Sequence, residues 1–473
     1  MTRLPLMIAL GLPLALPLAL GACAVGPEYA GPPKVVGPKS GDAAFTRGAK
    51  VAEQGPVLAR WWEVLGDAQL NALVVDALAH SPSVEDAQAR VREAGAVLNQ
   101  KKASDLPSVS PTLIAAKADL PPFTAGGKRS SLEIYNLGAT ASWEPDFWGI
   151  NKRTNENARA GVDRAKAQLA DAQVSLSAQV AQAYVNLRDA QNRAAMVAQV
   201  VALREQALDL VRQRHGAGVA TLADVARYEG DMRSAMAQAA PVRAQIEVAL
   251  NQLAVLTGKA PGDLDAALAQ AAPLPVLPAR VAVGDPAELL ARRPDVRAAE
   301  RLLAGNTAQV GVARAKLRPR LSFTGILGMG SSSISSIVDP ATAAYGILPQ
   351  LKWTGLDWGK GQASVVQAKA ERDSAEAQYR RAVLNALEDA ESSLSRFGAA
   401  RERLMQLEAG EGTARTNARL GAQRVSAGTS SKLEQTEREA QLLNAAITSA
   451  QGRAEVVVDY IAIAKALGLG WEG

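Results

Sequence analysis

Two long stretches of the chain carry apolar side chains at a helical spacing. They run from about Asn151 to Arg214 and from about Gly361 to Arg424, and neither contains proline. In the first stretch two interleaved apolar series repeat every seven positions: Val162, Leu169, Leu176, Ala183, Ala190 and Val197, and Val180, Leu187, Ala194, Val201 and Leu208. A helix with two apolar seams packs on two sides, as in a ring of helices, whereas a dimeric coiled coil needs only one seam. A helix of about 60 residues spans roughly 90 Å, which is longer than a globular core requires.

Each long helix is predicted to end at a glycine-containing turn and to be followed by a return helix. The turns contain Gly218 and Gly428, and the return helices are predicted at about 222–256 and 432–467. Glycine adopts the positive φ that a tight turn between helices requires. The pattern therefore predicts two long helical hairpins.

Two pairs of strand-like segments precede these hairpins. The segments lie at about 108–118 and 131–143, and at about 320–329 and 344–353, where Leu348 and Pro349 interrupt the alternation of apolar and polar residues. Runs of about ten residues with weak alternation and aromatic residues near one end are typical of transmembrane β-strands. A soluble hairpin in each pair would show the same alternation.

The chain contains an internal repeat. The segment Trp143–Gly149 matches Trp353–Gly359 at an offset of 353 − 143 = 210, and the turn at Arg214 matches that at Arg424 at the same offset. Upstream, Pro107-Ser-Val-Ser matches Pro319-Arg-Leu-Ser at 319 − 107 = 212. Two residues are therefore missing from the second copy between Ser322 and Trp353, where we expect a surface loop because length changes fall in loops.

Each copy also begins with a shorter helix. These helices are predicted at about 83–103 and 287–315, the second with Asp285 as N-cap and Pro286 at its first position. A further short helix is predicted at 67–79. Proline-rich residues 258–284 read as a coil that connects repeat one, residues 61–257, to repeat two, residues 285–473.

The N-terminus has the pattern of a lipoprotein signal peptide. Residues 1–22 combine Arg3 with an apolar stretch that contains three prolines, which suits a cleaved signal better than a permanent membrane helix. The stretch ends in Leu-Gly-Ala-Cys, which resembles the lipobox of bacterial lipoproteins and implies an acylated Cys23. An ordinary signal peptide is the alternative, but Cys23 is the only cysteine in the chain. By analogy with lipoprotein sorting, Ala24 favours the outer membrane, and residues 23–60, rich in Pro and Gly at first, read as a tether.

The number of strands indicates that several chains share one membrane structure. About four strands are predicted per chain. Four strands are too few to close a barrel, and an open sheet edge is not tolerated in lipid. If the strands span a membrane, sister chains must therefore complete the barrel.

Composition argues against an enzyme and against a nucleic-acid partner. The 52 Lys and Arg residues nearly balance 47 Asp and Glu residues, and no basic block is interleaved with aromatic residues. The only two histidines, His80 and His215, are predicted at the end of a short helix and in a turn. No cluster has metal-ligand spacing and no P-loop, GxSxG or HExxH motif occurs. We therefore expect no catalytic residue, no metal and no cofactor beyond the lipid on Cys23.

In this order and spacing, the motifs resemble the outer-membrane efflux protein family, the TolC-like proteins, and most closely its lipoprotein branch of OprM/NodT type. The resemblance covers residues 20–470. The residues that carry it are the lipobox at Cys23, Trp61-Trp62 with Leu70 and Leu73, the paired segments 143–149 and 353–359, the paired Arg-x-x-x-Gly turns, and Leu290-x-x-Arg-Pro-Asp-Val-x-x-Ala-Glu300.

The resemblance implies an α+β membrane protein in which two repeats form one third of a trimer. The homotrimer would have a twelve-stranded transmembrane β-barrel that continues into a long periplasmic α-helical barrel. It implies a periplasmic adaptor and an inner-membrane transporter, most often of RND type, as partners. The channel itself would be a passive exit duct for small molecules such as drugs, toxic compounds or metal ions.

The resemblance also implies roles for residues near the hairpin turns. Asp224, Glu434 and Glu437 match acidic positions that line the periplasmic gate, and the turns at Gly218 and Gly428 match the adaptor-docking region. Two departures stand out: the acids in copy two are Glu rather than the commoner Asp, and Val425 and Ser430 replace an aromatic residue and an Arg that tie the tip in some members. Solvated helix charges are the alternative interpretation of Glu434 and Glu437.

Three other protein classes share parts of this pattern. A protein-secretion outlet would have the same fold and serve an ABC exporter. A periplasmic adaptor would have one hairpin rather than two, flanked by glycine-rich β-domains. The third class is a purely structural coiled-coil lipoprotein, which conductance of the purified protein in planar bilayers would exclude. The exported substrate and the transporter class stay open.

Overall fold

The computed structural model describes residues 24–35, 45–47, 52–54, 59–120, 130–277, 281–283, 292–353 and 356–471. These residues form two compact units, and each is described by itself. The first contains residues 1–34, 90–165 and 298–379, and the second contains residues 35–89, 166–297 and 380–473. Cys23, Asp285 and Pro286 lie outside the described residues.

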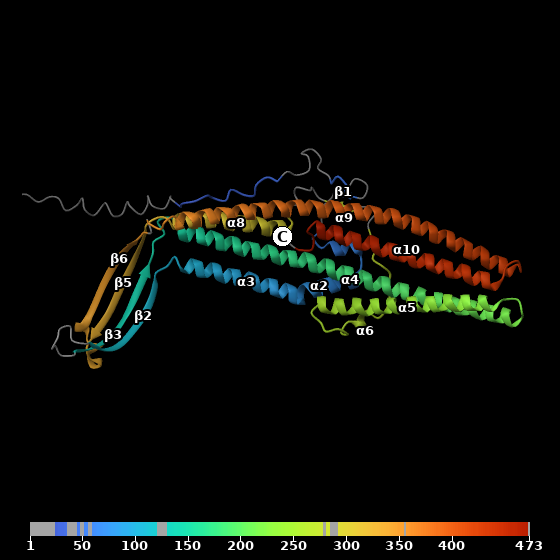
Figure 1. Ribbon diagram of the computed structural model, residues 1–473, viewed down its shortest axis with the longest axis horizontal. Coiled ribbons are helices and arrows are strands. Elements are labelled where there is room, and N and C mark those ends of the chain that lie inside the picture. The colour runs from blue at the N-terminus through green and yellow to red at the C-terminus, as the bar shows by residue number, and fades with distance from the viewer. Residues whose placement is uncertain are drawn as a thin grey trace, which may run out of the picture. The chain divides into compact units, whose positions relative to one another are not determined.

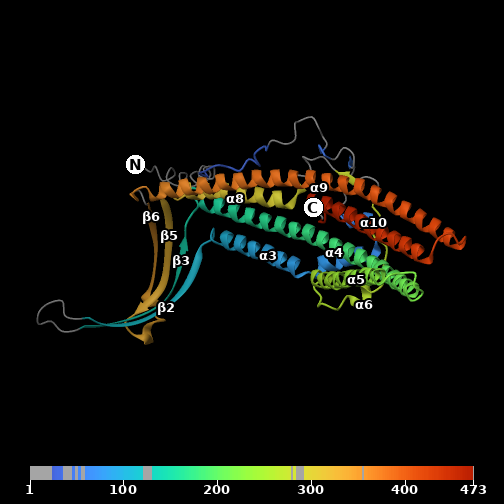
Figure 2. The ribbon, with the colours of Figure 1, turned by 45° about the vertical axis from the view of Figure 1, so that its right-hand side comes forward.

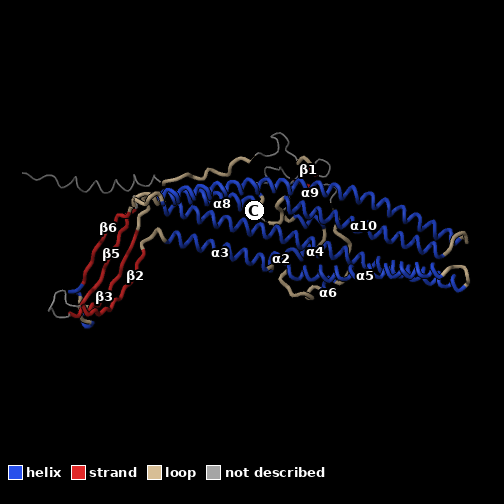
Figure 3. Tube along the Cα trace, viewed as in Figure 1, coloured by secondary structure: helices blue, strands red, loops and turns tan. Residues whose placement is uncertain are grey.

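The first unit is built on a four-stranded antiparallel sheet. Its strands are β2 (Ser108–Leu120), β3 (Ser130–Trp143), β5 (Arg320–Ser331) and β6 (Ala343–Lys352). Their order across the sheet is β2-β3-β5-β6, so each repeat supplies one hairpin and the two hairpins join through β3 and β5. Figure 3 shows the strands side by side in this order. All four predicted strands are confirmed.

The register places odd-numbered residues on one face of the sheet. Leu113 lies opposite Leu137, Leu137 lies opposite Met329, and Leu327 lies opposite Tyr345. Paired residues share a face, so the odd face is mostly apolar, whereas the even face carries Ser, Thr, Asn, Gly and Gln along with a few apolar residues. In Figure 2 the sheet is seen as a curved ribbon of strands.

The length difference between the repeats falls in the hairpin of the second copy. There β5 ends at Ser331 and β6 begins at Ala343, and the connection contains two short 3-10 helices, Ile334–Ser336 and Pro340–Thr342.

The helices repeat in order and in length. The long helices α4 (Ile150–Gly216) and α9 (Lys360–Ser426) each have 67 residues, and the return helices α5 (Leu222–Leu256) and α10 (Lys432–Ala466) each have 35. The shorter helices are α3 (Pro82–Ala103) and α8 (Pro294–Ala315). These bounds lie within two residues of the predicted ones except at the start of α8. The helix predicted at 287–315 is interrupted at Arg293, because a proline disfavours the helical conformation of the residue before it, and α8 begins only at Pro294. Figure 1 shows each return helix running back beside the long helix that precedes it.

The second unit contains the largest apolar core. The 3-10 helix η2 (Trp61–Leu65) and α2 (Ala68–His80) pack Trp61, Leu70 and Val74 against α4, α5 and α10. Helix α2 begins where predicted because the Asp67 carboxylate accepts hydrogen bonds from the backbone N–H groups of Gln69 and Leu70. Such a cap satisfies donors that have no partner within the helix.

The connector between the repeats is not coil throughout, which corrects the sequence-based prediction. It contains the short helix α6 (Asp265–Leu268) and the strand β4 (Val281–Val283), which pairs in parallel with β1 (Ala52–Gln54). The guanidinium of Arg188, only 1% exposed, donates to the Gln270 carbonyl over 2.7 Å and thereby fastens the connector to α4. Charged helix residues are normally solvated, so this buried contact of Arg188 could not be predicted from the amino-acid pattern.

Residues 24–29 of the tether dock on the first unit. The Val25 N–H donates to the Trp148 carbonyl over 3.2 Å, and the Tyr29 hydroxyl donates to Glu300 over 3.0 Å. A Cβ atom on Gly26 would collide with the backbone of Gly311, so the two glycines allow the backbones to touch. The first part of the tether is therefore a packed strap without helix or strand.

Within the described part of the chain, no helix is both long enough and apolar enough to cross a membrane.

Candidate functional site

The two hairpin turns have the same hydrogen-bond pattern at an offset of 210. In the first, the N–H of Gly218 donates to His215 over 2.8 Å and that of Val219 donates to Arg214 over 2.8 Å. In the second, the N–H of Gly428 donates to Val425 over 3.0 Å and that of Thr429 to Arg424 over 2.9 Å. This paired 5→2 and 6→1 arrangement is a Schellman motif, which satisfies the last carbonyls of the long helix.

The conformation of the turns explains both glycines. Gly218 has φ +72° and Gly428 has φ +73°, and a Cβ atom at either position would meet nothing within 4 Å. The requirement is therefore for backbone conformation rather than for space. The space beside both turns is open, as a docking surface requires.

The side chains beside the turns differ between the copies. Val219 and Leu222 are 66% and 71% exposed in the first turn. Their counterparts at the offset of 210 are Thr429 and Lys432, which are polar and also exposed. The first hairpin turn thus presents apolar side chains, and the second presents polar side chains.

Asp224 completes a capping box at the start of α5. Its carboxylate accepts hydrogen bonds from the Thr221 hydroxyl over 2.7 Å and from the Thr221 N–H over 2.9 Å, while the Asp224 N–H donates to the Thr221 hydroxyl. These bonds, first that of the hydroxyl and then that of the backbone, lower the pKa of Asp224. The residue therefore stays ionised at neutral pH and has a structural role as a cap.

Glu434 occupies the same position at the start of α10. Its N–H donates to the N-cap hydroxyl of Ser431 over 3.2 Å, and its carboxylate accepts from the Ser430 hydroxyl and pairs with Arg438. Ser430 therefore forms a hydrogen bond at the hairpin turn, although some family members have an Arg at this position.

Glu437 joins the two helical hairpins. Its carboxylate accepts a hydrogen bond from the hydroxyl of Tyr228 on α5, which is only 3% exposed. Burial and this bond raise the pKa of the Tyr228 phenol. The Tyr228 ring packs with Ala207, Leu208 and Val211 of α4, and Leu433 of α10 packs against the same cluster.

All three predicted acids thus lie in the first two turns of the return helices, and each has a polar partner in its own chain. Glu434 and Glu437 are half-buried and bonded, so simple solvated charges do not describe them. Tyr228 was not predicted as a site residue. Its signal was an aromatic residue near the start of a return helix, one position after Arg227, which corresponds to Glu437 at the offset of 437 − 227 = 210.

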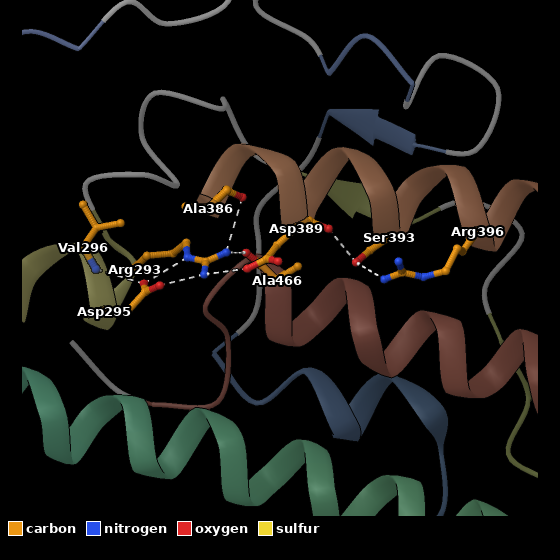
Figure 4. Close-up of polar contacts among 8 residues, drawn as sticks. All are labelled: Arg293, Asp295, Val296, Ala386, Asp389, Ser393, Arg396 and Ala466. Atoms are coloured by element: carbon orange, nitrogen blue, oxygen red, sulfur yellow. Dashed lines mark hydrogen bonds and ion pairs between the residues drawn. The ribbon is translucent and has the colours of Figure 1, made fainter. Parts of the chain in front are cut away.

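Arg293, from the Leu-x-x-Arg-Pro-Asp-Val motif, joins the start of α8 and the end of α10 to the middle of α9 (Figure 4). Its guanidinium pairs with Asp295 over 2.8 Å and with Asp389 of α9 over 3.1 Å, and it donates to the Ala466 carbonyl at the end of α10 over 2.7 Å. A cavity of about 260 Å³ adjoins it. These contacts give the motif a structural role: it caps α10 and joins it to α8 and α9.

Among the described residues, no group of three or more His, Cys, Asp or Glu side chains is placed to hold a metal ion. His80 ends α2 as predicted, and His215 lies in the last turn of α4, where its Nδ1 contacts the Ala220 carbonyl at 2.9 Å.

Comparison with known proteins matches both repeats to one family. The model of the family described as "Outer membrane efflux protein" matches residues 73–259 and 286–469. Nodulation protein T of Rhizobium leguminosarum bv. trifolii is 31% identical over 381 residues, which cover 80% of this chain and 79% of that protein. Outer membrane protein OprJ of Pseudomonas aeruginosa is 29% identical over 471 residues, which cover 97% of this chain and 95% of that protein.

A solved structure shows the same fold. The outer-membrane channel OprN superposes with a TM-score of 0.86 at 33% identity, over 95% of this chain and 100% of that one. The match of both repeats, the extent of the sequence similarity and the shared fold agree with the resemblance inferred from the motifs. The chain belongs to the outer membrane efflux protein family.

Proposed function

We propose that this protein is the outer membrane channel of a tripartite efflux system. In this role it is a passive exit duct for small molecules such as drugs, toxic compounds or metal ions. A periplasmic adaptor and an inner-membrane pump, most often of RND type in this family, deliver the substrate, and the pump supplies the energy. The observation that carries this proposal is the twofold occurrence of a β-hairpin followed by a helical hairpin of 67 and 35 residues, in a chain of this family.

The protein acts as a homotrimer in this proposal. Among the described residues, one chain supplies four strands to this sheet, and neither outer strand has a partner on its outer side. Open sheet edges are not tolerated in lipid, so sister chains must complete the barrel. Three chains give twelve strands, with the apolar odd face toward lipid and the more polar even face toward the lumen.

Cys23 anchors the protein to the outer membrane through acyl chains in this proposal. The docked strap that begins at Ala24 supports it, because it holds the adjoining chain against the first unit beside Trp148. Mass spectrometry of the mature N-terminal peptide tests the anchor. An unmodified Cys23, or a mature chain that still carries residues 1–22, would contradict it.

The acids at the hairpin tips form the periplasmic gate in this proposal. Around a trimer axis, three copies each of Asp224, Glu434 and Glu437 would focus a negative potential and favour cations. The bond between Tyr228 and Glu437 supports a gating role, because separation of the two hairpins at this level breaks it.

The turns at Gly218 and Gly428 bind the adaptor in this proposal. Their support is the open space beside both glycines and the exposed Val219 and Leu222 of the first turn, which offer apolar contact area.

Conductance in planar lipid bilayers tests the channel directly, and gene deletion tests its physiological role. We expect purified protein to form discrete cation-favouring pores, and the deletion strain to become more susceptible to drugs or metals. Loss of a secreted protein without a change in susceptibility would instead identify a protein-secretion outlet. A purified protein that never conducts would contradict the channel function.

A further inference from the structure

A cavity of about 440 Å³ lies between the connector and the second helical hairpin, within the second unit. The residues that line it are mostly apolar and include Leu274, Leu277, Phe397, Leu404, Val456 and Val457. Its charged lining residues are Arg401, Glu408 and Arg453. Mostly apolar cavities of this size with a few polar groups are typical binding sites for small molecules.

The two helical hairpins correspond closely at the level of this cavity. The guanidinium of Arg193 on α4 donates to Gln245 on α5 over 2.8 Å, and Arg403 on α9 pairs with Glu455 on α10. The offsets are 403 − 193 = 210 and 455 − 245 = 210, the same offset that relates the hairpin turns. Each residue near the cavity can therefore be compared with its counterpart in repeat one.

In repeat one the chain itself covers the equivalent surface. Leu268 of α6 is 1% exposed and belongs to the apolar core that contains Leu187. The side-chain amide of Gln191 donates to the Leu268 carbonyl over 2.7 Å, so a polar acceptor is held beside an apolar side chain. The counterparts of Leu187 and Gln191 at the offset of 210 are Phe397 and Arg401, and both line the cavity.

The connector covers the second helical hairpin less completely. Arg188, which donates to the Gln270 carbonyl in repeat one, has Gly398 as its counterpart, and glycine has no side chain to repeat this bond. Val276 of the connector and Met405 of α9 line the cavity and are 79% and 60% exposed. A ligand that removes apolar side chains from water gains free energy, and methionine adapts readily to the shape of a ligand.

We propose that this cavity binds a small organic anion, a carboxylate attached to an apolar body of aliphatic or aromatic carbon. The apolar body packs against Phe397 and Leu404, where repeat one has the side chain of Leu268. The carboxylate accepts hydrogen bonds from Arg401, where repeat one has the neutral bond between Gln191 and the Leu268 carbonyl. The site needs one chain only, because all residues that line the cavity belong to the second unit, and it does not rest on the channel function.

The charges around the cavity favour an anion. Arg453 pairs with Glu408 over 3.0 Å and with Glu411 over 3.3 Å, so its charge is balanced within the chain. The guanidinium carbon of Arg401 lies over the Phe397 ring, 5.7 Å from the ring centre. A planar guanidinium offers two parallel N–H donors to a carboxylate. Because Arg401 is half-buried, a carboxylate bound to it is partly withdrawn from water, which strengthens the bond.

2-Naphthoate tests the site in the full-length protein, because its fused rings are apolar and its carboxylate is ionised at neutral pH. Equilibrium dialysis of the purified protein in detergent measures binding. 2-Naphthamide, which has nearly the same shape without the charge, is the matched ligand.

Hydrogen bonds to a charged group are stronger than hydrogen bonds between neutral groups. We therefore expect saturable binding of the acid, with a dissociation constant about tenfold lower than that of the amide. Equal affinity for the two ligands, or no saturable binding of the acid, would overturn the proposal.

Three variants locate the bound ligand. Arg401→Gln introduces the residue of repeat one and should weaken binding of the acid about tenfold while it leaves binding of the amide nearly unchanged. Met405→Trp places a larger ring at the exposed rim of the cavity and should weaken binding of both ligands without lowering the melting temperature. Arg419→Gln removes an exposed charge of α9 outside the cavity and should change neither affinity.

Two results from these variants would show that the assigned site is wrong. If Arg401→Gln and Arg419→Gln weaken binding equally, net charge alone attracts the anion. If Met405→Trp binds both ligands as the wild type does, the ligand lies outside the cavity.

Hydrogen exchange of the connector gives a second measurement. A ligand that contacts both the connector and the second helical hairpin opposes their separation by mass action. At a concentration of 2-naphthoate ten times its dissociation constant, exchange of the amides in residues 267–277 should slow about tenfold. Unchanged exchange in these residues at saturating ligand would refute the proposed position of the ligand.

Discussion

The hydrogen bond between Tyr228 and Glu437 joins the helical hairpins near their turns, and Tyr228→Phe removes it while the ring is kept. Hydrogen bonds to a charged group contribute about 1.5–3 kcal/mol. Because Glu437 is half-buried, water replaces part of the lost bond, so the lower value applies. A loss of about 1.5 kcal/mol corresponds to about a tenfold change in an equilibrium between joined and separated hairpins.

We therefore expect Tyr228→Phe to raise the open probability of single channels in planar bilayers by about tenfold. Tyr184→Phe is the matched control, because Tyr184 is fully buried in the core of the second unit and its hydroxyl donates to Asp67 over 2.8 Å. Its loss should lower thermal stability without opening the pore. If Tyr228→Phe lowers stability as the control does and leaves the open probability unchanged, the bond is structural only and the reasoning fails.

Three further predictions concern the turns, their caps and the contacts of Arg293. Gly218→Ala and Gly428→Ala should each cost about 1–2 kcal/mol of local stability because φ is positive, as measured by hydrogen exchange at the turns; Gly216→Ala, at a helical position with open space, should cost nothing measurable. Folding lowers the pKa of Asp224 from its ordinary value of 3.8. Its contribution to folding stability is therefore complete above pH 3.8, and it is lost as the pH falls through the lower pKa of the folded state. The difference in melting temperature between wild type and Asp224→Asn should thus be present at pH 7 and shrink at more acidic pH, and a difference independent of pH would contradict the capping role. Arg293→Met should destabilise the second unit by on the order of 2 kcal/mol, because it leaves the Ala466 carbonyl at the end of α10 without its donor; an unchanged melting temperature would show that the contacts of Arg293 are dispensable.

The long helices and the strands were predictable because their periodicity extends over many residues. In α4 the two heptad series run from Val162 to Val197 and from Val180 to Leu208, and such sustained regularity indicates a helix. The ends were predictable because Gly218 and Thr221 have the chemistry of a C-cap and an N-cap. The same reasoning would have identified Asp224 as part of a capping box, since Thr-x-x-Asp precedes the return helix.

Contacts between distant segments were not predictable in the same way. Strands β1 and β4 have three residues each and are about 229 positions apart, so neither has enough length to show alternation. The hydrogen bond between Tyr228 and Glu437 depends on how α5 and α10 are rotated about their axes relative to each other. The spacing of apolar residues along a helix constrains this rotation only loosely. The acids of the candidate site were found from the family resemblance, but their partners came from the structure.

The strap at residues 24–29 has a consequence for how the protein matures. Ala24 lies so close to Gly149 that a Cβ atom on Gly149 would collide with Ala24. An enzyme that cleaved the proposed leader and acylated Cys23 would have to hold the chain on both sides of the cleavage site. The contacts of Ala24 with Gly149 and of Gly26 with Gly311 leave no room for such an enzyme. If the proposed processing takes place, it must therefore precede docking of the strap.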